Sequence, residues 1–204
     1  MARFVIQGGR RLSGEFTPGG NKNSVLPMLA ACTLTEEPVT LENVPLIKDV
    51  QTMLAILDDL GVTVNVDGHT LKLCAKGLRR SRLSPSLCKE VRSSILFAGP
   101  LAARLGRATL FPPGGDIIGR RRLDTHFLGL RSLGIDVEGG ATYVFRRRTL
   151  QAAEIVLDEA SVTATENILM AAVLAPGLTS LYNAACEPHV QDLCSLLVKM
   201  GAKI

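Results

Sequence analysis

The sequence from Asp49 to Val66 reads DVQTMLAILDDLGVTVNV and predicts a helix, a stop and a strand in succession. Apolar residues recur at helical spacing in its first part, including Met53, Ile56 and Leu60, so one face of a helix would be buried. Gly61 follows this pattern directly, at the position where many helices end in a left-handed backbone that glycine adopts without strain. Polar and apolar residues then alternate, which is typical of a strand with one buried face.

The same succession occurs three times along the chain. A β-like run, a polar loop, an amphipathic helix and a Leu/Met-Gly-aliphatic stop recur, with the stops at Gly61, Gly134 and Gly201. The glycines are about 70 residues apart, and such a period indicates copies of one supersecondary unit. A strand, a turn and a second strand follow the first two glycines, but not Gly201. We therefore expect the third unit to lack its closing hairpin, so that either another chain supplies it or the chain is a truncated product.

A second helix is predicted before the opening strand of each unit. The segments 24–34, 89–105 and 165–175 are rich in Ala and Leu and apolar almost all round, so they are expected to be buried. Two helices and two strands in each unit indicate an α/β domain with threefold pseudo-symmetry. Its helices would form the interior and its sheets the outer wall.

The composition favours an ordinary globular protein. The chain has 204 residues, of which 47% are hydrophobic and 21% charged, and a net charge of +4 that suits small anions as well as nucleic acid. Its five cysteines are scattered without a CxxC pair, which argues against a zinc site or a disulfide framework. No run approaches the roughly 18 apolar residues of a membrane span. Residues 1–9 lack a signal-peptide core and predict a strand leading into a turn, so we expect a cytoplasmic protein.

A glycine-rich loop over residues 18–24 leads directly into the first buried helix. The N-terminus of a helix offers backbone N–H groups and a partial positive charge, and Lys22 adds a full one. The loop is therefore a candidate site for a phosphate or carboxylate. The alternative is simple capping of the helix by Asn or Ser, with Lys22 in solvent.

Arg92 is a second candidate for binding an anion. It lies within an apolar helical run beside Ser93 and Ser94, where a guanidinium is costly unless it meets an anion at the start of the helix. The alternative is a surface arginine at a helix end.

The segment 112–126 combines glycines, a lone carboxylate at Asp116 and three consecutive arginines. Loops on rigid scaffolds often carry catalytic groups, and a carboxyl that is desolvated over an anionic ligand can act as a general acid. The alternative is an exposed loop with a solvated basic run.

Two further segments contain polar or basic groups. Small hydroxyl residues over 160–165, followed by Glu166 and Asn167, form a helix cap and can also hold uridine or diphosphate oxygens. The basic run 146–148 is interpreted as a solvated sheet edge. Aromatic residues are scarce near the basic runs, so recognition of nucleic acid by stacking is poorly supported.

Taken together, these segments resemble the UDP-N-acetylglucosamine 1-carboxyvinyltransferases, a family of enolpyruvyl transferases. The resemblance covers the whole chain and keeps the family's order of motifs. The motifs are Gly20-Asn21-Lys22-Asn23-Ser24, Val91-Arg92-Ser93-Ser94, Pro113-Gly114-Gly115 with Ile118-Gly119 and Asp124-x-His126, Ser161-Val162-Thr163-Ala164-Thr165-Glu166-Asn167, and Asn183-Ala184-Ala185-Cys186-Glu187-Pro188.

The resemblance implies an inside-out α/β barrel of three repeats, and a reaction that makes a peptidoglycan precursor. The enolpyruvyl group of phosphoenolpyruvate moves to the 3′-hydroxyl of UDP-N-acetylglucosamine, with no cofactor or metal. It also implies that residues 1–21 pack with a second domain and that the barrel domain spans 22–204. The implied catalytic residues are Asp116 as proton donor, Lys22 and Arg121. The implied phosphoenolpyruvate ligands are Lys22, Asn23, Arg92 and Arg121, and the implied UDP-N-acetylglucosamine ligands are Asn23, Arg92, Arg121, Arg122, Leu123, Asp124, Thr125, Ser161, Val162 and Thr163.

The chain departs from the family pattern at three positions and in length. Asp116 stands where cysteine is usual, which predicts insensitivity to epoxides that alkylate that thiol. Arg122 replaces a proline and Thr163 a glycine. The second domain, which supplies a carboxylate near the reacting hydroxyl in the family, has no counterpart here. The alternative function is therefore a non-catalytic half-enzyme that binds a UDP-sugar or regulates a full-length copy.

Overall fold

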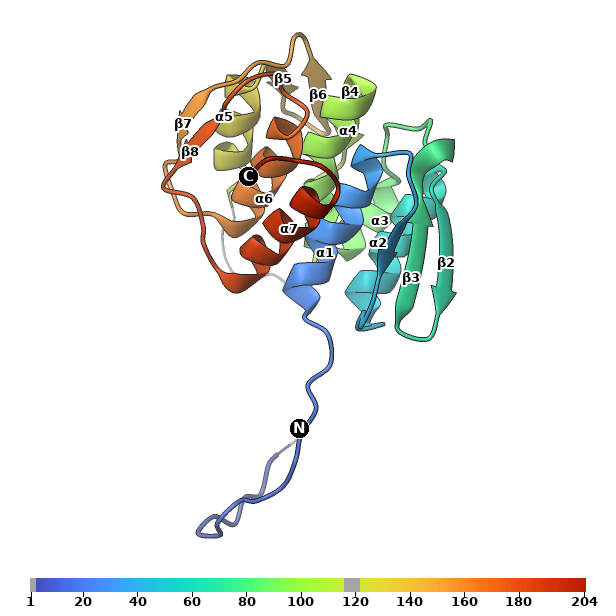
Figure 1. Ribbon diagram of the computed structural model, residues 1–204, viewed down its shortest axis with the longest axis vertical. Coiled ribbons are helices and arrows are strands. Elements are labelled where there is room, and N and C mark those ends of the chain that lie inside the picture. Colours follow the sequence, from blue (N-terminus) through green and yellow to red (C-terminus); the bar gives the residue numbers. More distant parts are fainter. Residues whose placement is uncertain (1–2, 116–121) are drawn as a thin grey trace.

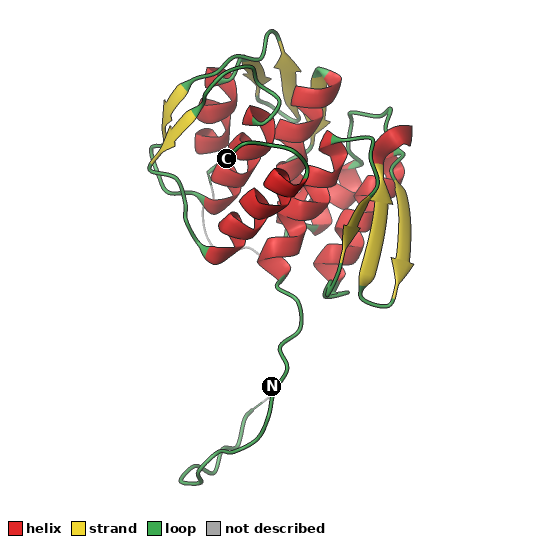
Figure 2. Cartoon of the chain, in the orientation of Figure 1, coloured by secondary structure: helices red, strands yellow, loops and turns green. Residues whose placement is uncertain are grey.

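Helices fill the interior of the molecule and three small sheets lie around them (Figures 1 and 2). The computed structural model describes residues 3–115 and 122–204. The predicted α/β class is confirmed, and no closed barrel of strands occurs in these two segments. The three units expected from the sequence are called the first, second and third repeats below, and they are taken as residues 22–77, 78–149 and 150–204.

The first repeat follows its sequence pattern closely. The turn glycine Gly61 has a left-handed φ of 94°, and Gly134 and Gly201 in the other repeats have 85° and 105°, so the three predicted helix stops are confirmed. The sheet is antiparallel in the order β1-β3-β2. Its elements are α1 (Lys22–Ala31), η1 (Cys32–Leu34), β1 (Val39–Leu41), α2 (Lys48–Leu60), β2 (Thr63–Asp67), β3 (Thr70–Cys74) and η2 (Ala75–Gly77).

The second repeat differs from its prediction in one helix. The helix expected over 89–105 is broken at Val91, whose backbone is extended, because the carbonyls of Cys88 and Lys89 accept the N–H groups of Gly114 and Gly115 instead of continuing a helical ladder. A Cβ on Gly114 would lie 1.8 Å from the Lys89 carbonyl oxygen, so only glycine permits this approach. The elements are α3 (Pro85–Glu90), η3 (Arg92–Phe97), α4 (Ala98–Leu105), β4 (Arg107–Leu110), α5 (Asp124–Ser132), β5 (Ile135–Glu138) and β6 (Tyr143–Arg147), with sheet order β4-β6-β5.

The third repeat contains a sheet of two strands. β8 (Ser180–Tyr182) pairs in parallel with β7 (Glu154–Val156), a three-residue strand that the sequence pattern did not predict. The equivalent place in the second repeat is taken by Arg82, which bridges in parallel to Thr109 of β4. Helix α6 (Val162–Ala172) is the buried helix and α7 (Pro188–Lys199) the amphipathic one. In the described part of the chain α7 is the last element.

The N-terminal segment lies away from the body of the molecule (Figure 1). Residues 3–21 contain no helix or strand, so the strand predicted near the N-terminus is not formed here. The physical reason is that a strand needs a neighbour for its N–H and C=O groups, and the described residues provide none for this segment.

The buried helices pack closely against one another. A Cβ on Gly99 of α4 would lie 2.4 Å from the Asn167 carbonyl oxygen of α6, and one on Gly129 of α5 would lie 2.1 Å from Ile168. These glycines let α4, α5 and α6 approach each other at the centre of the core. No helix in the described segments is both long and apolar enough to cross a membrane.

Candidate functional site

The buried helices of all three repeats begin at one cleft. Lys22 starts α1, Arg92 starts η3 and Val162 starts α6, and all three residues line the same cavity of about 720 Å³. The three helix starts belong to segments far apart in the sequence, and the fold brings them to one place. One cationic side chain therefore comes from the first repeat and one from the second.

The start of α1 combines a cap with a charged side chain. The Asn21 side-chain oxygen accepts the N–H of Asn23 at 2.8 Å, so the capping interpretation of this loop is confirmed. Lys22 forms an ion pair with Asp49, and about half of its side chain, 48%, is exposed to solvent. The cap and the cation therefore coexist, and Lys22 faces the cleft.

The start of η3 places Arg92 against the glycine-rich loop. A Cβ on Gly115 would lie 3.2 Å from the backbone nitrogen of Arg92, so the loop passes close to the start of this helix. The hydroxyl of Ser93 also belongs to the cleft wall and is buried without a hydrogen-bond partner in the described parts of the chain. An unsatisfied buried hydroxyl beside a guanidinium is a group that an oxygen-rich ligand can satisfy.

The start of α6 has no side-chain cap. Ser161 occupies the N-cap position with an extended backbone, but its hydroxyl makes no capping hydrogen bond. The N-terminus of an α-helix carries a partial positive charge and unsatisfied N–H groups. An anion in the cleft would meet these groups.

A buried hydrogen-bond network lies behind the cleft. Asn167 of α6 accepts the N–H of Gly99 at 2.6 Å and contacts Nδ1 of His126 at 3.1 Å. His126 Nε2 in turn lies 3.2 Å from the hydroxyl of Thr163, which lines the cleft. Burial, and then the charge of Arg92, lowers the pKa of His126 to about 3, so the imidazole is neutral near pH 7.

Glu166 is a second buried polar group on α6. It is 2% exposed and its Oε1 has no hydrogen-bond partner within the described segments. Burial, and then the charge of Glu187, raises the pKa of this carboxyl to about 8. Glu166 is therefore protonated over most of the neutral range.

The cleft carries more positive than negative side chains among its described lining residues. Four cationic side chains and three carboxylates line it, and the N-termini of α1 and α6 add positive potential. The arrangement suits a ligand with several negative charges. The cations are Lys22, Lys48, Arg92 and Arg122, and the carboxylates are Asp49, Glu90 and Glu159.

Comparison with known proteins identifies the family. The family model described as EPSP synthase (3-phosphoshikimate 1-carboxyvinyltransferase) matches residues 6–204. The chain belongs to this family. Among curated proteins, it is 54% identical to the UDP-N-acetylglucosamine 1-carboxyvinyltransferase of Bradyrhizobium diazoefficiens over 99% of its own length and 47% of that protein. The enzyme of the same name from Treponema denticola is 51% identical over all of the chain and 48% of that protein.

Solved structures confirm the enolpyruvyl transferase fold. The enolpyruvyl transferase NikO from Streptomyces tendae superimposes with a TM-score of 0.80 at 24% identity, covering 97% of the chain and 47% of NikO. An EPSP synthase from Acinetobacter baumannii gives 0.70 at 20% identity, over 87% and 42% of the two chains. The chain thus spans about half the length of the family members it matches.

The structure brings most of the predicted ligand and catalytic residues into one place. Lys22, Asn23, Arg92, Arg122 and residues 161–163 line the cleft. Asp116 and Arg121 lie outside the described residues.

Three of the predicted ligands do not line the cleft. Leu123 is buried in the core at 8% exposure, and Thr125 donates its hydroxyl hydrogen to Asp158 at 2.6 Å. Asp124 pairs with Arg122 at 2.6 Å and so touches the cleft only through that arginine. Their hydroxyl and carboxylate groups are thus already used within the protein.

Sequence reasoning missed the importance of His126 and Asn167. Both belong to motifs that carry the resemblance, but His126 was given no role and Asn167 was predicted only as part of a helix cap. That prediction was wrong, because the N-cap residue Ser161 makes no side-chain capping hydrogen bond. The available signal was a polar side chain in a helix predicted to be apolar all round, because a buried amide needs partners on its neighbours.

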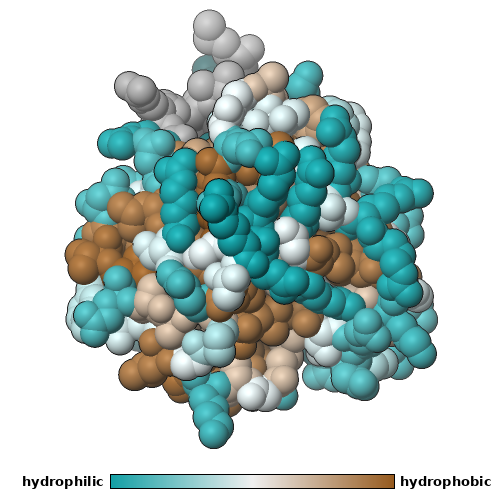
Figure 3. Space-filling view, turned by 90° about the horizontal axis from the view of Figure 1, so that it is seen from above, coloured by the Kyte–Doolittle hydropathy of each residue, from teal (hydrophilic) through white to brown (hydrophobic). Residues whose placement is uncertain are grey.

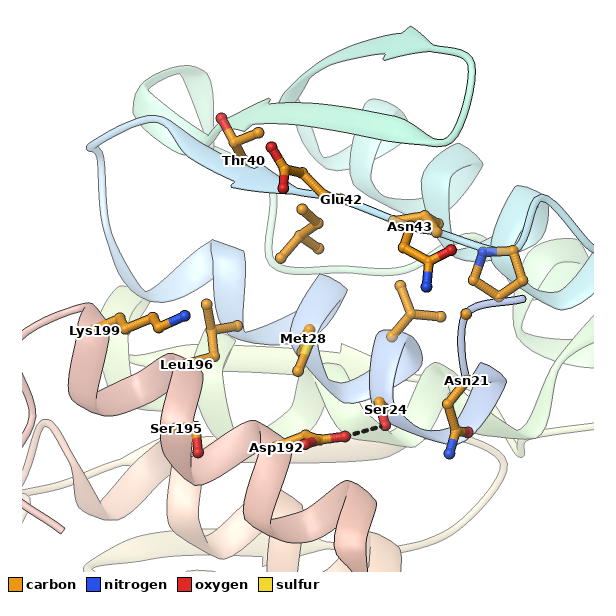
Figure 4. A pocket seen from close by; sticks show the side chains of 15 residues that line it. Asn21, Ser24, Met28, Thr40, Glu42, Asn43, Asp192, Ser195, Leu196 and Lys199 are labelled. Atoms are coloured by element: carbon orange, nitrogen blue, oxygen red, sulfur yellow. Dashed lines mark hydrogen bonds between the residues drawn. The ribbon is translucent and has the colours of Figure 1, made fainter. Parts of the chain in front are cut away.

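A second cavity of about 500 Å³ lies between α1, β1 and α7 (Figure 4). Its labelled polar side chains include Ser24, which donates a hydrogen bond to Asp192 at 2.7 Å. The cavity lies between the first and third repeats. Neither Lys22 nor Arg92 lines it, so it is separate from the cleft that carries the family motifs.

The basic run 146–148 at the end of β6 forms contacts with β5 and α4. Arg146 pairs with Glu138 and Arg148 with Asp136, and Arg147 donates to the carbonyl oxygen of Ala103 at 2.6 Å. The end of the molecule opposite the N-terminal segment shows hydrophilic side chains gathered across its centre, with apolar areas between them (Figure 3). The side chains of Arg146 and Arg148 are 48% and 78% exposed, which matches the interpretation of the run as a solvated edge. The described residues contain no group of three or more His, Cys, Asp or Glu side chains that could hold a metal ion.

Proposed function

We propose that this chain is the substrate-binding half of an enzyme that transfers the enolpyruvyl group of phosphoenolpyruvate to the 3′-hydroxyl of UDP-N-acetylglucosamine. The observation that carries the proposal is the convergence of three helix starts, with Lys22 and Arg92, on one cleft. The 54% identity to a UDP-N-acetylglucosamine 1-carboxyvinyltransferase supports the choice of substrates. The reaction would supply a peptidoglycan precursor in the cytoplasm.

The charges of the cleft match those of the proposed substrates. Phosphoenolpyruvate carries a phosphate and a carboxylate, which charge-assisted hydrogen bonds from Lys22, Arg92 and Arg121 would hold. Binding would require Lys22 to share its charge between the ligand and Asp49. Asn23 would contact the sugar, while Arg122 and residues 161–163 would contact the UDP moiety.

The proton in this reaction is assigned to Asp116. Addition of the 3′-hydroxyl to C2 of phosphoenolpyruvate needs a proton at the methylene carbon, and a carboxylic acid delivers one where cysteine does so in the family. The hydroxyl proton would pass to the carboxylate of the second domain, and loss of a methyl proton together with phosphate would then give the enol ether product. Asp116→Cys would then create sensitivity to alkylating epoxides in an active assembly, and Asp116→Asn would abolish turnover.

The proposal includes the inside-out barrel architecture and a second domain. The N-terminal segment supports the second part, because Phe4, Ile6 and Leu12 are 94%, 86% and 93% exposed to solvent. Large apolar groups exposed in this way are typical of a surface that packs on other polypeptide. Residues 1–21 would pack with the second domain, which a longer chain or a second chain would supply.

Calorimetric titration with phosphoenolpyruvate and with UDP-N-acetylglucosamine tests the binding role. We expect Lys22→Ala to weaken phosphoenolpyruvate binding by about tenfold or more, because a charge-assisted hydrogen bond is lost. Lys72→Ala, on the exposed face of β3, is the matched control and should bind as the parent does. Unchanged affinity in Lys22→Ala would leave only the capping role for this loop.

A phosphate-release assay separates the proposal from the alternative of a non-catalytic half-enzyme. The chain alone should release no phosphate from the two substrates, and adding the missing half of a relative should restore turnover. Binding without any restored turnover would favour the regulatory alternative. Robust turnover by the chain alone would contradict the need for a second domain.

A further inference from the structure

The orientation of the Asn167 amide is fixed by two backbone groups. Its Oδ1 accepts the N–H of Gly99 at 2.6 Å, and its Nδ2 donates to the carbonyl oxygen of Ile95 at 2.7 Å. A flipped amide would face an N–H with an NH₂ group and a carbonyl with an oxygen, so both bonds would be lost. Asn167 is fully buried, which makes such a loss expensive.

The fixed amide determines the tautomer of His126. The second hydrogen of Asn167 Nδ2 faces Nδ1 of His126 at 3.1 Å, so Nδ1 must accept. The imidazole is buried at 1% exposure beside the cationic Arg92 and is neutral. A neutral ring whose Nδ1 accepts carries its proton on Nε2.

The tautomer in turn orients the hydroxyl of Thr163. The Nε2–H of His126 donates to Thr163 Oγ1 at 3.2 Å, so the hydroxyl hydrogen must point toward some other acceptor. No acceptor for it occurs within the described segments. Thr163 is the second residue of α6 and lines the cleft, beside the uncapped N-terminus of that helix.

We propose that Thr163 donates a hydrogen bond to an anionic oxygen of the ligand in the cleft, and that Asn167 and His126 are positioning residues that turn its hydroxyl hydrogen toward that ligand. This inference rests on the proposed function and adds a recognition group to it. The ligand oxygen belongs to a phosphate, because the N-terminus of α6 favours negative charge at this point. The hydroxyl and the helix N–H groups would then hold the same phosphate.

Nitrogen-15 NMR of the histidine rings tests the relay without any ligand. The chain has three histidines, so His69→Gln and His189→Gln assign the His126 signals. We expect the Nε2–H tautomer near neutral pH. An Nδ1–H tautomer, or a protonated ring near neutral pH, would overturn the relay.

Calorimetric titration with uridine diphosphate tests the donor role. Thr163→Val keeps the shape of the side chain but removes the hydroxyl, and we expect it to bind about tenfold or more weakly. Thr163→Ser restores the hydroxyl and should bind within about threefold of the parent. Equal binding by Thr163→Val and the parent would overturn the donor role.

Asn167→Asp tests the coupling between the two parts. A carboxylate at this position accepts hydrogen bonds, so His126 would switch to the Nδ1–H tautomer and its Nε2 would accept from Thr163. We expect this tautomer switch together with a loss of affinity similar to that of Thr163→Val. A tautomer switch without loss of affinity for uridine diphosphate would overturn the positioning role. If Asn167→Asp does not fold, the variants Thr163→Val and Thr163→Ser still decide the donor role. A parent chain that binds no uridine diphosphate would contradict the proposed function and the donor role, whereas the NMR result would still decide the relay.

Discussion

The second and third repeats each contain a buried helix and an amphipathic helix, but they differ in how the strand between those helices is flanked. β4 has a neighbour on both edges, because the segment around Arg82 pairs with one edge and β6 with the other. β8 pairs only with β7 within the described residues, and Tyr182 at its end is 52% exposed. The cleft nevertheless receives the start of a buried helix from both repeats. The comparison indicates that the candidate site is built from the inner helices, and we expect the completeness of the outer sheets to affect stability instead.

Equivalent core leucines give the largest expected effect. Leu130 of α5 and Leu197 of α7 both stand four residues before the glycine stop and are 0% and 1% exposed. We expect Leu130→Ala to lower the free energy of unfolding by about 4 kcal/mol and Leu197→Ala by about 2 kcal/mol, because a cavity beside an open sheet collapses more easily. Urea denaturation measures both.

Leu57 is the control for this pair, since it holds the same position in the first repeat and packs under a three-stranded sheet. Its alanine variant should resemble Leu130→Ala. Equal losses at Leu130 and Leu197 would show that the outer sheets contribute nothing to the difference between the repeats.

The buried carboxyl of the third repeat should make stability fall as pH rises. The pKa of Glu166 is raised to about 8 in the folded state, so the folded chain holds this proton through a range in which the unfolded chain has lost it. The contribution of the protonated Glu166 side chain to the free energy of unfolding is therefore fully present below the ordinary pKa of a carboxyl. It is lost as the pH rises toward about 8. Relative to the parent, Glu166→Gln should gain roughly 2 kcal/mol between about pH 5.5 and about pH 7.5, measured by denaturation. A difference that is independent of pH would mean that Glu166 is ionised in the fold.

The buried imidazole of the second repeat should have the opposite effect, so that stability falls as pH is lowered. The pKa of His126 is lowered to about 3, so the unfolded chain binds a proton below its ordinary pKa of about 6.5 and the folded chain does not. Stability is lost as pH falls through this range. His126→Gln should remove a slope of about 1.4 kcal/mol per pH unit below about pH 6. An unchanged slope would show that His126 is protonated in the folded chain.

The smallest effect is expected from the surface of the β5–β6 hairpin, the part that the third repeat lacks in the described residues. Asp136 pairs with Arg148, with 45% and 78% of the two side chains exposed. Exposed ion pairs stabilise little, so Asp136→Asn should lower the free energy of unfolding by less than about 1 kcal/mol. A larger loss would mean that the hairpin stabilises the second repeat through charge as well as through burial.

The helix stops and most strands could be predicted from the sequence because each depends on local rules. Gly61 and Gly134 end their helices in the left-handed conformation that their patterns require. The break at Val91 could not be predicted, because it depends on Gly114 reaching the end of α3 from a distant loop. β7 was missed for the same reason, since three residues form a strand there only because β8 lies beside them.

The candidate site was predictable as far as charge and helix position determine it. Lys22 stands next to a predicted helix start, whereas Arg92 was predicted inside the helix 89–105 and stands at the start of η3; both line the cleft. The roles of Thr125 and Asn167 depend on which side chains lie opposite them across helix contacts, and sequence spacing does not contain that information.

The most direct test of the account is an amide NMR titration of the chain with UDP-N-acetylglucosamine. We predict that the largest chemical-shift changes fall on residues 22–24, 92–94 and 161–164, at the starts of α1, η3 and α6. Changes clustered instead around the cavity between α1 and α7, near Ser195 and Lys199, or no changes at all, would contradict a ligand site built from three helix starts.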